Sequence, residues 1–361
     1  MKRIGLVVAV VVACLAGATA VTLSVLSTKD TPAPRPSPTA GPVTPGAPPA
    51  IATSDGPFAA GPIAPPEQGS YLGAWVRPEH LTESGRVTAM TAWEKSVGRK
   101  MAIVNTYRRF DENFFNASDE QFAARGTTLM LSWAGGDTRL VSMGRYDDLI
   151  RERARELKAF GRPVLLRYRW EMDRPNLRAQ MWSGEDYVAA WRHVRGIFTT
   201  EGATNASWVW CPTAEGFLGG YAAPFYPGDD QVDWNCVDVY AGSTYDTIGA
   251  LMKPFLEFCA RHPAKPVMVG EFGVARVWGT EQRAAWLHDA SATFKANPQI
   301  RAVMYFESDP IGNRGPTQQF QVSDDPAVLG AFRASLAQDP HYTPMTAAKA
   351  GAKNSVKNRK K

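Results

Sequence analysis

Histidine and cysteine are both scarce in this chain, with 5 and 4 copies among its 361 residues. The cysteine spacings fit no zinc pattern, and no histidine comes at the end of a predicted strand. The chain also lacks a Gly-rich loop after its first predicted strand, where a dinucleotide-binding fold carries its phosphate contacts. No Ser-His-Asp order is visible either. These absences argue against metal, nucleotide-cofactor and serine-nucleophile chemistry, so we predict no cofactor and no metal site.

Aromatic residues are missing from the basic C-terminal stretch. The net charge of +5 and the sequence pI of about 9.0 come from six Lys and Arg residues behind Pro344, without which the chain is close to neutral. A nucleic-acid-binding segment usually interleaves aromatic residues with its charges. We therefore predict that residues 341–361 form a disordered basic tail and that nucleic acid is not a partner.

The N-terminus has the pattern of an export segment. Lys2-Arg3 precedes an apolar run from Ile4 to about Leu26. Ala18-Thr19-Ala20 offers a cleavage site for a signal peptidase. The run is also long enough to remain as a membrane anchor, and a loose lipoprotein box ends at Cys14. Residues 1–30 are therefore interpreted as a signal peptide or an anchor, with the lipoprotein as a third alternative.

Residues 31–68 are dominated by Pro, Ala, Gly, Ser and Thr. Such a composition cannot bury enough apolar surface to fold, so we predict a disordered, partly polyproline spacer. We expect an extracellular or cell-surface-anchored monomer, tethered to the membrane if the N-terminal segment is retained.

Short β-rich runs alternate with longer amphipathic stretches through residues 69–340. The strand candidates are Tyr71–Val76, Met101–Tyr107, Thr128–Trp133, Pro163–Trp170, Ser207–Cys211, Trp234–Tyr240, Pro266–Glu271 and Ile300–Phe306. The helical patterns cover Arg145–Phe160, Gly184–Thr200, Thr244–His262, Thr280–Ala296 and Pro326–Leu336. The β-rich runs are near-continuously apolar, which indicates burial on both faces. Eight such units predict a (β/α)8 barrel. A doubly wound open sheet is the alternative.

Three cysteines fall in the predicted barrel. A disulfide is permitted outside the cytoplasm. Cys211 and Cys236 lie on strands predicted to be neighbours, so we predict this pair and leave Cys259 free. Three buried thiols are the competing interpretation.

Carboxylates and aromatic residues gather at the C-terminal ends of the predicted strands, where a barrel of this kind carries its active site. Glu171 and Glu271 end strands four and seven, on opposite sides of the ring, and we predict that they are the catalytic pair of a glycosidase. Aromatic faces stack on sugar rings. The candidate substrate-binding residues are Tyr107, Trp133, Arg167, Trp170, Trp210, Asp238, Tyr240, Tyr305 and Phe306.

The chain resembles glycoside hydrolase family 26, the β-mannanase family of retaining TIM-barrel enzymes. The resemblance lies in GRPVLLRYRWEM (161–172), YVAAWRHV (187–194), GATNASWVW (202–210), YPGDDQVDW (226–234) and KPVMVGEFG (265–273). It implies that Glu171 is the acid/base, that Glu271 is the nucleophile, and that Tyr240 contacts the nucleophile. The family usually has His before the acid/base and Asn after the Met, where this chain has Trp170 and Asp173.

The leading hypothesis is therefore a retaining endo-β-glycanase that acts on a polysaccharide, with β-mannan first and mixed-linkage β-glucan second. A non-catalytic carbohydrate-binding or envelope scaffold protein on the same barrel is the alternative from a different class. A transglycosylating enzyme would use the same residues.

Overall fold

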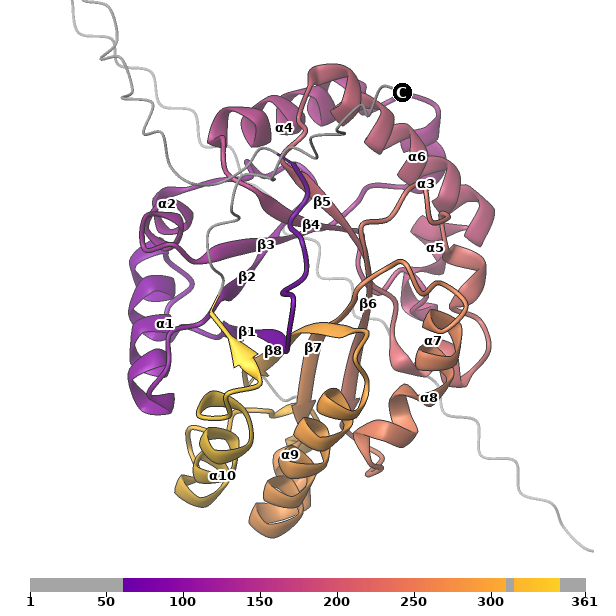
Figure 1. The fold of residues 1–361 in the computed structure, drawn as a ribbon. Helices are drawn as coiled ribbons and strands as arrows, with labels where there is room; N and C mark the ends of the chain where they lie inside the picture. Colours follow the sequence, from indigo (N-terminus) through magenta and orange to yellow (C-terminus); the bar gives the residue numbers. More distant parts are fainter. Residues whose placement is uncertain (1–60, 310–314, 345–361) are drawn as a thin grey trace, which may run out of the picture. The chain divides into compact units, whose positions relative to one another are not determined.

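The structure is a computed structural model that describes residues 61–309 and 315–344. Its eight main strands run parallel and in chain order, and β1 (Ser70–Val76) pairs with both β2 (Ile103–Arg108) and β8 (Ile300–Glu307). The sheet is therefore closed into a ring, with the helices around its outside (Figure 1). The predicted (β/α)8 barrel is confirmed, and the doubly wound alternative is wrong.

The other strands are β3 (Thr128–Trp133), β4 (Val164–Tyr168), β5 (Ala206–Trp210), β6 (Trp234–Ala241) and β7 (Val267–Val274), and a short β9 (Tyr342–Thr343) pairs with β1. The helices are α1 (Glu83–Val97), α2 (Ala117–Ala124), α3 (Thr138–Ser142), α4 (Asp147–Phe160), α5 (Arg178–Met181), α6 (Gly184–Glu201), α7 (Ala214–Leu218), α8 (Ile248–Cys259), α9 (Gly279–Ala296) and α10 (Pro326–Phe332). The five predicted helices correspond to α4, α6, α8, α9 and α10.

Helix α6 shows how local sequence sets these bounds. Its N-cap Ser183 accepts a hydrogen bond from the backbone N–H of Asp186, and the acidic first turn suits the positive end of the helix dipole. Gly202 ends the helix with φ 73°, a left-handed conformation that glycine adopts without strain. Helix α1 was harder to predict because it buries only Met90, Trp93 and Val97 of its 15 residues.

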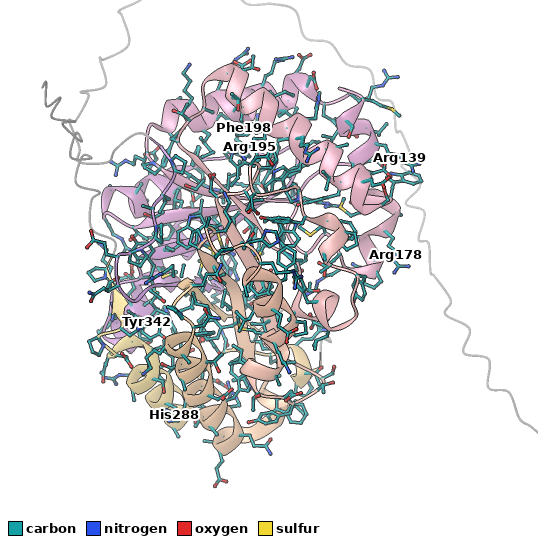
Figure 2. All side chains as sticks on the ribbon, turned by 45° about the vertical axis from the view of Figure 1, so that its right-hand side comes forward. Arg139, Arg178, Arg195, Phe198, His288 and Tyr342 are labelled. Carbon is teal, nitrogen blue, oxygen red and sulfur yellow. A yellow bond between two sulfur atoms is a disulfide. The ribbon has the colours of Figure 1, made fainter. Side chains whose placement is uncertain are left out.

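The barrel has two concentric cores because side chains alternate along each strand. Met130 and Leu165 point into the ring and belong to a compact inner core. Leu131 and Leu166, one residue further along, belong to the larger layer between the strands and the helices. Side chains fill both layers (Figure 2). A residue near the C-terminal end of a strand therefore reaches the site only if its side chain points into the ring.

The N-terminal end of the ring is covered by residues just before β1. The backbone N–H of Ile63 donates to Ser207 Oγ at 2.6 Å, and the Ile63 carbonyl accepts from the Trp234 indole Nε1 at 3.1 Å. Ile63 also packs against the inner core. This end of the predicted 31–68 linker therefore packs on the barrel.

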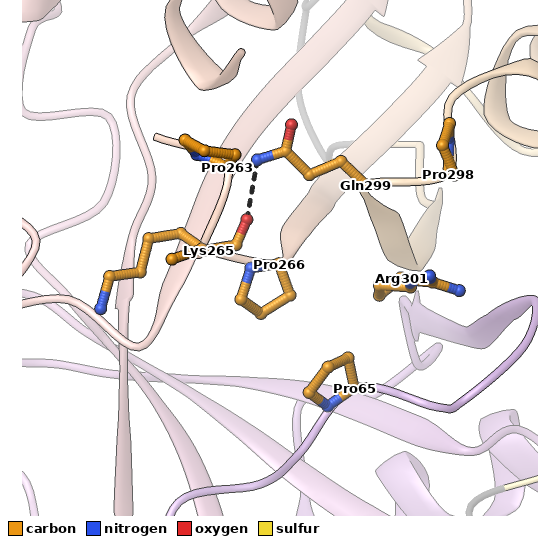
Figure 3. A pocket seen from close by; sticks show the side chains of 8 residues that line it. Pro65, Pro263, Lys265, Pro266, Pro298, Gln299 and Arg301 are labelled. Carbon is orange, nitrogen blue, oxygen red and sulfur yellow. Dashed lines mark hydrogen bonds between the residues drawn. The ribbon is translucent and has the colours of Figure 1, made fainter. Parts of the chain in front are cut away.

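A hollow of about 400 Å³ lies near the same end of the strands, lined by Pro65, Pro263, Ala264, Lys265, Pro266, Pro298, Gln299 and Arg301 (Figure 3). Gln299 Nε2 donates to the Lys265 carbonyl at 2.9 Å across this hollow. No carboxylate lines it, and its lining residues lie before β1 and β7 and at the start of β8, whereas Glu271 lies in the C-terminal half of β7. It is therefore not the place for glycosidic chemistry.

The predicted export segment lies outside the described residues, as do most of the predicted linker and tail. Within the described ranges, no helix has both the length and the apolar character needed to cross a bilayer.

Candidate active site

A β-bulge in β7 turns Glu271 into the ring. Val237 of β6 lies opposite Val269 of β7, but the next residue, Asp238, lies opposite Glu271. The extra residue on β7 is Gly270. Strict alternation would have placed Glu271 in the outer layer with Val269. The bulge therefore brings the carboxylate into the site.

Gly270 is required by the close approach of its neighbours. A Cβ at this position would lie 2.5 Å from Cys236 Sγ, 2.8 Å from Asp238 Oδ1 and 2.9 Å from Cys211 Sγ. Real Cβ atoms essentially never show contacts this short. The bulge can therefore form only with glycine at this position unless its neighbours move.

Cys211 and Cys236 form a disulfide, and Cys259 is free and buried. The predicted pairing is confirmed. Within residues 61–309 and 315–344, the sulfurs of this pair and the Asp238 carboxylate are also the one group with the spacing of metal ligands. The disulfide removes both thiolates that a metal would need, so this cluster does not fit a metal site.

Glu271 is buried and accepts hydrogen bonds from three strands. Tyr107 Oη donates to Oε1 at 2.6 Å, Tyr240 Oη donates to Oε2 at 2.5 Å, and the Arg167 guanidinium donates to Oε1. Burial raises the pKa of both tyrosines, and the charge of Glu271 raises it further, so both phenols stay protonated as donors. Three donors from different strands fix the orientation of this carboxylate.

Arg167 is a fully buried cation whose charge is balanced on two sides. Its Nη1 donates to both carboxylate oxygens of Asp238 at 2.8 Å, and its other terminal nitrogen reaches Glu271. Its Nε donates to Ser132 Oγ at 2.8 Å, which in turn donates to Asn105 Oδ1 at 2.7 Å. We predicted that Arg167 and Asp238 bind substrate. Both side chains are buried, and Arg167 joins Asp238 to Glu271, so the structure places them where they position Glu271.

Glu171 lies in a tight turn three residues after β4. Its backbone is left-handed, with φ 53°, and its N–H donates to the Cys211 carbonyl at 2.7 Å. Such a conformation is costly for a non-glycine residue and is found mainly where function requires it. Burial raises the pKa of Glu171 to about 7. The charge of Glu271 adds to this rise, while Arg174 acts in the opposite direction.

Arg174 is a site residue that sequence reasoning missed, and Asp173 was noted only as a departure from the resembled family. The Arg174 guanidinium donates to Glu171 Oε1 while its side chain is 43% exposed. Asp173 accepts from the backbone N–H of Thr213 at 3.1 Å and from its hydroxyl at 2.6 Å. Asp173 therefore ties the turn that carries Glu171 to the segment after β5. The i, i+3 spacing of Arg174 from Glu171 was the available signal.

An aromatic wall stands beside the two glutamates. The Trp170 ring lies 5.3 Å from that of Tyr107, and Arg167 Cζ lies 5.4 Å from the Trp170 centroid. Trp75 meets the other side of Tyr107 at 5.0 Å, and Phe306 lies 5.8 Å from Tyr240. All these rings except Trp75 were predicted. Trp75 lies four residues after Tyr71, which points into the ring, so the alternation along β1 would have identified it.

Three predicted sugar platforms are core residues instead. Trp133, Trp210 and Tyr305 are fully buried in the layer between the strands and the helices. Their neighbours explain why: Ser132 and Cys211 point into the ring, so Trp133 and Trp210 must point out of it. The prediction that these three residues stack on substrate is therefore wrong.

No protein-family model matches the chain. In sequence, the chain is similar to Endoglucanase H of Acetivibrio thermocellus, with 27% identity over 290 residues, covering 74% of this chain and 30% of that protein. It is also similar to the β-1,3-xylanase TXYA of a Vibrio species, with 38% identity over 115 residues, covering 29% and 23%. The chain therefore spans less than a third of the length of these relatives.

Solved structures of β-mannanases are similar in fold. A family 26 β-mannanase from Bacteroides ovatus matches with a TM-score of 0.56 and 16% identity, covering 77% of this chain and 93% of that one. An endo-β-1,4-mannanase from Cellulomonas fimi matches with a TM-score of 0.58 and 18% identity, covering 78% and 74%. At this level of identity the similarity shows the barrel fold alone.

Proposed function

We propose that the protein hydrolyses internal bonds of a β-linked polysaccharide through a covalent intermediate on Glu271. The observation that carries this proposal is that two neighbouring carboxyl groups, those of Glu171 and Glu271, have different surroundings. Glu271 is held in one orientation by three hydrogen-bond donors. Glu171 has a pKa raised to about 7, chiefly by burial, which suits a proton donor. The raised pKa of Glu171 assigns the proton donor, and the three hydrogen bonds that orient Glu271 assign the nucleophile.

In the first step, Glu271 attacks the anomeric carbon and the bond from that carbon to the leaving oxygen breaks. Glu171 gives its proton to that oxygen, so the sugar leaves as an alcohol. In the second step, Glu171 takes a proton from water while the water oxygen attacks the anomeric carbon. This releases Glu271 and retains the configuration.

Arg167, Tyr107 and Tyr240 have positioning roles in this scheme. They hold the Glu271 carboxylate in one orientation before the reaction, which avoids reorganisation as the bond forms. Trp75 and Trp170 are the proposed stacking surfaces for the sugar next to the scissile bond, since they line the same wall as Tyr107.

We propose β-mannan as the first substrate and mixed-linkage β-glucan as the second. The names of the similar β-mannanases and of Endoglucanase H support a mannan or a glucan as a starting point. Trp170, where the resembled family has His, is where a difference in sugar preference is expected to arise.

The test is hydrolysis of a panel of β-glycans by the full chain, followed by the size distribution and anomeric configuration of the products. Glu271→Ala should abolish turnover while binding persists, and Glu171→Ala should retain turnover only on aryl glycosides whose leaving group needs no proton. Glu185→Ala, an exposed glutamate on α6, is the matched control and should behave as the unaltered protein. Binding without turnover by the unaltered protein would instead identify a non-catalytic carbohydrate-binding protein.

We further propose that the protein is exported and acts outside the cytoplasm. The basic and apolar N-terminal pattern supports this, as does the Cys211–Cys236 disulfide, since such bonds persist in oxidising compartments. Fractionation of cells that express the full chain, with and without residues 1–30, would separate a released protein from a membrane-retained one.

A further inference from the structure

Trp182 is a large aromatic side chain that the protein holds rigidly at its surface. It follows α5 in the connection between β4 and α6, and half of its side chain is exposed. Its backbone has φ 59° and ψ −78°, a conformation that costs energy for any residue with a side chain.

Two contacts fix the indole. Its Nε1 donates to Asp137 Oδ2 at 2.8 Å, and Arg139 Cζ lies 4.3 Å from the ring centroid. Arg139 is itself held by two hydrogen bonds to Asp186, at 3.1 and 3.2 Å. Figure 2 shows Arg139 at the outer edge of the molecule, on the same side as Arg178 of α5.

The Arg139 guanidinium lies over the ring, and Asp137 takes the one polar edge of the indole. Half of the residue remains exposed, so part of the apolar ring surface is open to a ligand. An exposed apolar face that is already immobilised loses little conformational entropy when a ligand covers it. The ligand that fits is a flat, partly apolar surface of ring size.

We propose that Trp182 is a secondary contact for the polysaccharide, on which a pyranose ring of the same β-linked chain stacks at a distance from the scissile bond. This inference rests on the proposed function for the choice of polymer. The position of Trp182 agrees with this proposal, because the connection from the C-terminal end of β4 to α6 carries both Glu171 and Trp182. Arg169 links the two parts of this connection through its contacts with Gln180 and Met181 Sδ.

The test compares long and short substrates. Trp182→Ala should raise KM for the polymer about five- to tenfold, the effect expected from the loss of one aromatic contact, with kcat unchanged. Hydrolysis of short oligosaccharides that span only the two glutamates should be unaffected. Trp182→Phe should restore much of the affinity, and Trp182→Gly, which removes the ring and relieves the backbone, should behave as Trp182→Ala does. Met143→Ala, an exposed apolar residue just after α3, is the matched control.

Calorimetric binding of the polymer to Glu271→Gln, with and without Trp182→Ala, separates this inference from the proposed function. If the unaltered enzyme cleaves no β-glycan, the proposed function fails. If it cleaves the polymer but Trp182→Ala and Trp182→Gly leave KM and binding unchanged, the secondary contact is wrong. An equal loss on polymer and short oligosaccharides would also overturn it, because Trp182 would then act at the scissile bond or on the fold.

Discussion

Arg174 donates a hydrogen bond to the Oε1 atom of Glu171, so the proposed proton donor is paired with a cation before substrate arrives. This pairing opposes the role of an acid, since a nearby positive charge favours the ionised carboxylate. Burial outweighs it, and the pKa of Glu171 is raised to about 7. Arg174 therefore limits how far the pKa of the acid rises.

Arg174→Gln should move the basic limb of the kcat/KM profile to higher pH. The first step needs protonated Glu171, so activity falls as the pH rises through its pKa, and loss of the cation raises that pKa further. The profile is measured on a neutral β-glycan at low and high salt. Since Arg174 is partly exposed, salt should move the limb of the unaltered enzyme in the same direction. Arg178→Gln, the control, removes the same charge four residues further on and should leave the basic limb of the pH profile nearly unchanged. An equal shift in both variants would contradict a specific effect of Arg174.

Tyr240→Phe should lower kcat by about 10- to 100-fold without unfolding the barrel. It removes a hydrogen bond to the proposed nucleophile, and hydrogen bonds to charged groups contribute about 1.5–3 kcal/mol. Tyr107→Phe should act in the same way on the other oxygen of Glu271. Steady-state kinetics and the thermal midpoint are measured together. Tyr245→Phe, whose hydroxyl donates to the Gln282 carbonyl, is the control, and unchanged kcat in both site variants would remove the positioning role.

The barrel could be predicted from sequence because its strands are near-continuous apolar runs, which report burial directly. The candidate site could be predicted only in part. Strand ends indicated which residues lie at the open end of the ring, but not which of two neighbours points inward. Trp133 and Tyr305 were misplaced for that reason. Side chains alternate along a strand, so one residue known to point into the ring would have given the orientation of its neighbours on the same strand.

Alternation alone would also have failed at Glu271, because the bulge at Gly270 shifts the register of β7. A single glycine in a strand does not reveal whether it marks a bulge or a close contact, and here it marks both. Arg174 was missed because its i, i+3 spacing from Glu171 was the one available signal, and residue type does not indicate the left-handed turn at Glu171 when glycine is absent.

Gly270→Ala should destabilise the protein by about 1–3 kcal/mol, since the added methyl group would press on the Cys236 sulfur and on Asp238. Activity should fall by more than stability explains, because Glu271 follows the bulge directly. Thermal unfolding and kcat on the same samples separate the two effects. Gly196→Ala on α6 is the matched control, since no atom lies within 4 Å of its added Cβ. It should be neutral or stabilising by up to about 1 kcal/mol, as expected for alanine in a helix.

Loss of the Cys211–Cys236 disulfide should weaken both the fold and the site. The bond joins residues 25 apart in sequence, and closing such a loop is commonly worth about 2–4 kcal/mol. The Cys211 carbonyl also accepts the hydrogen bond from the backbone of Glu171, so movement of this segment should displace the proposed acid. The double variant Cys211→Ala with Cys236→Ala should unfold at a lower temperature and have a lower kcat than the oxidised protein. A reductant should lower the midpoint of the unaltered protein and have no effect on the double variant. Cys259→Ala, which removes the free buried thiol, should keep the response to reductant, and a double variant as stable and active as the oxidised protein would show that the bond contributes to neither property.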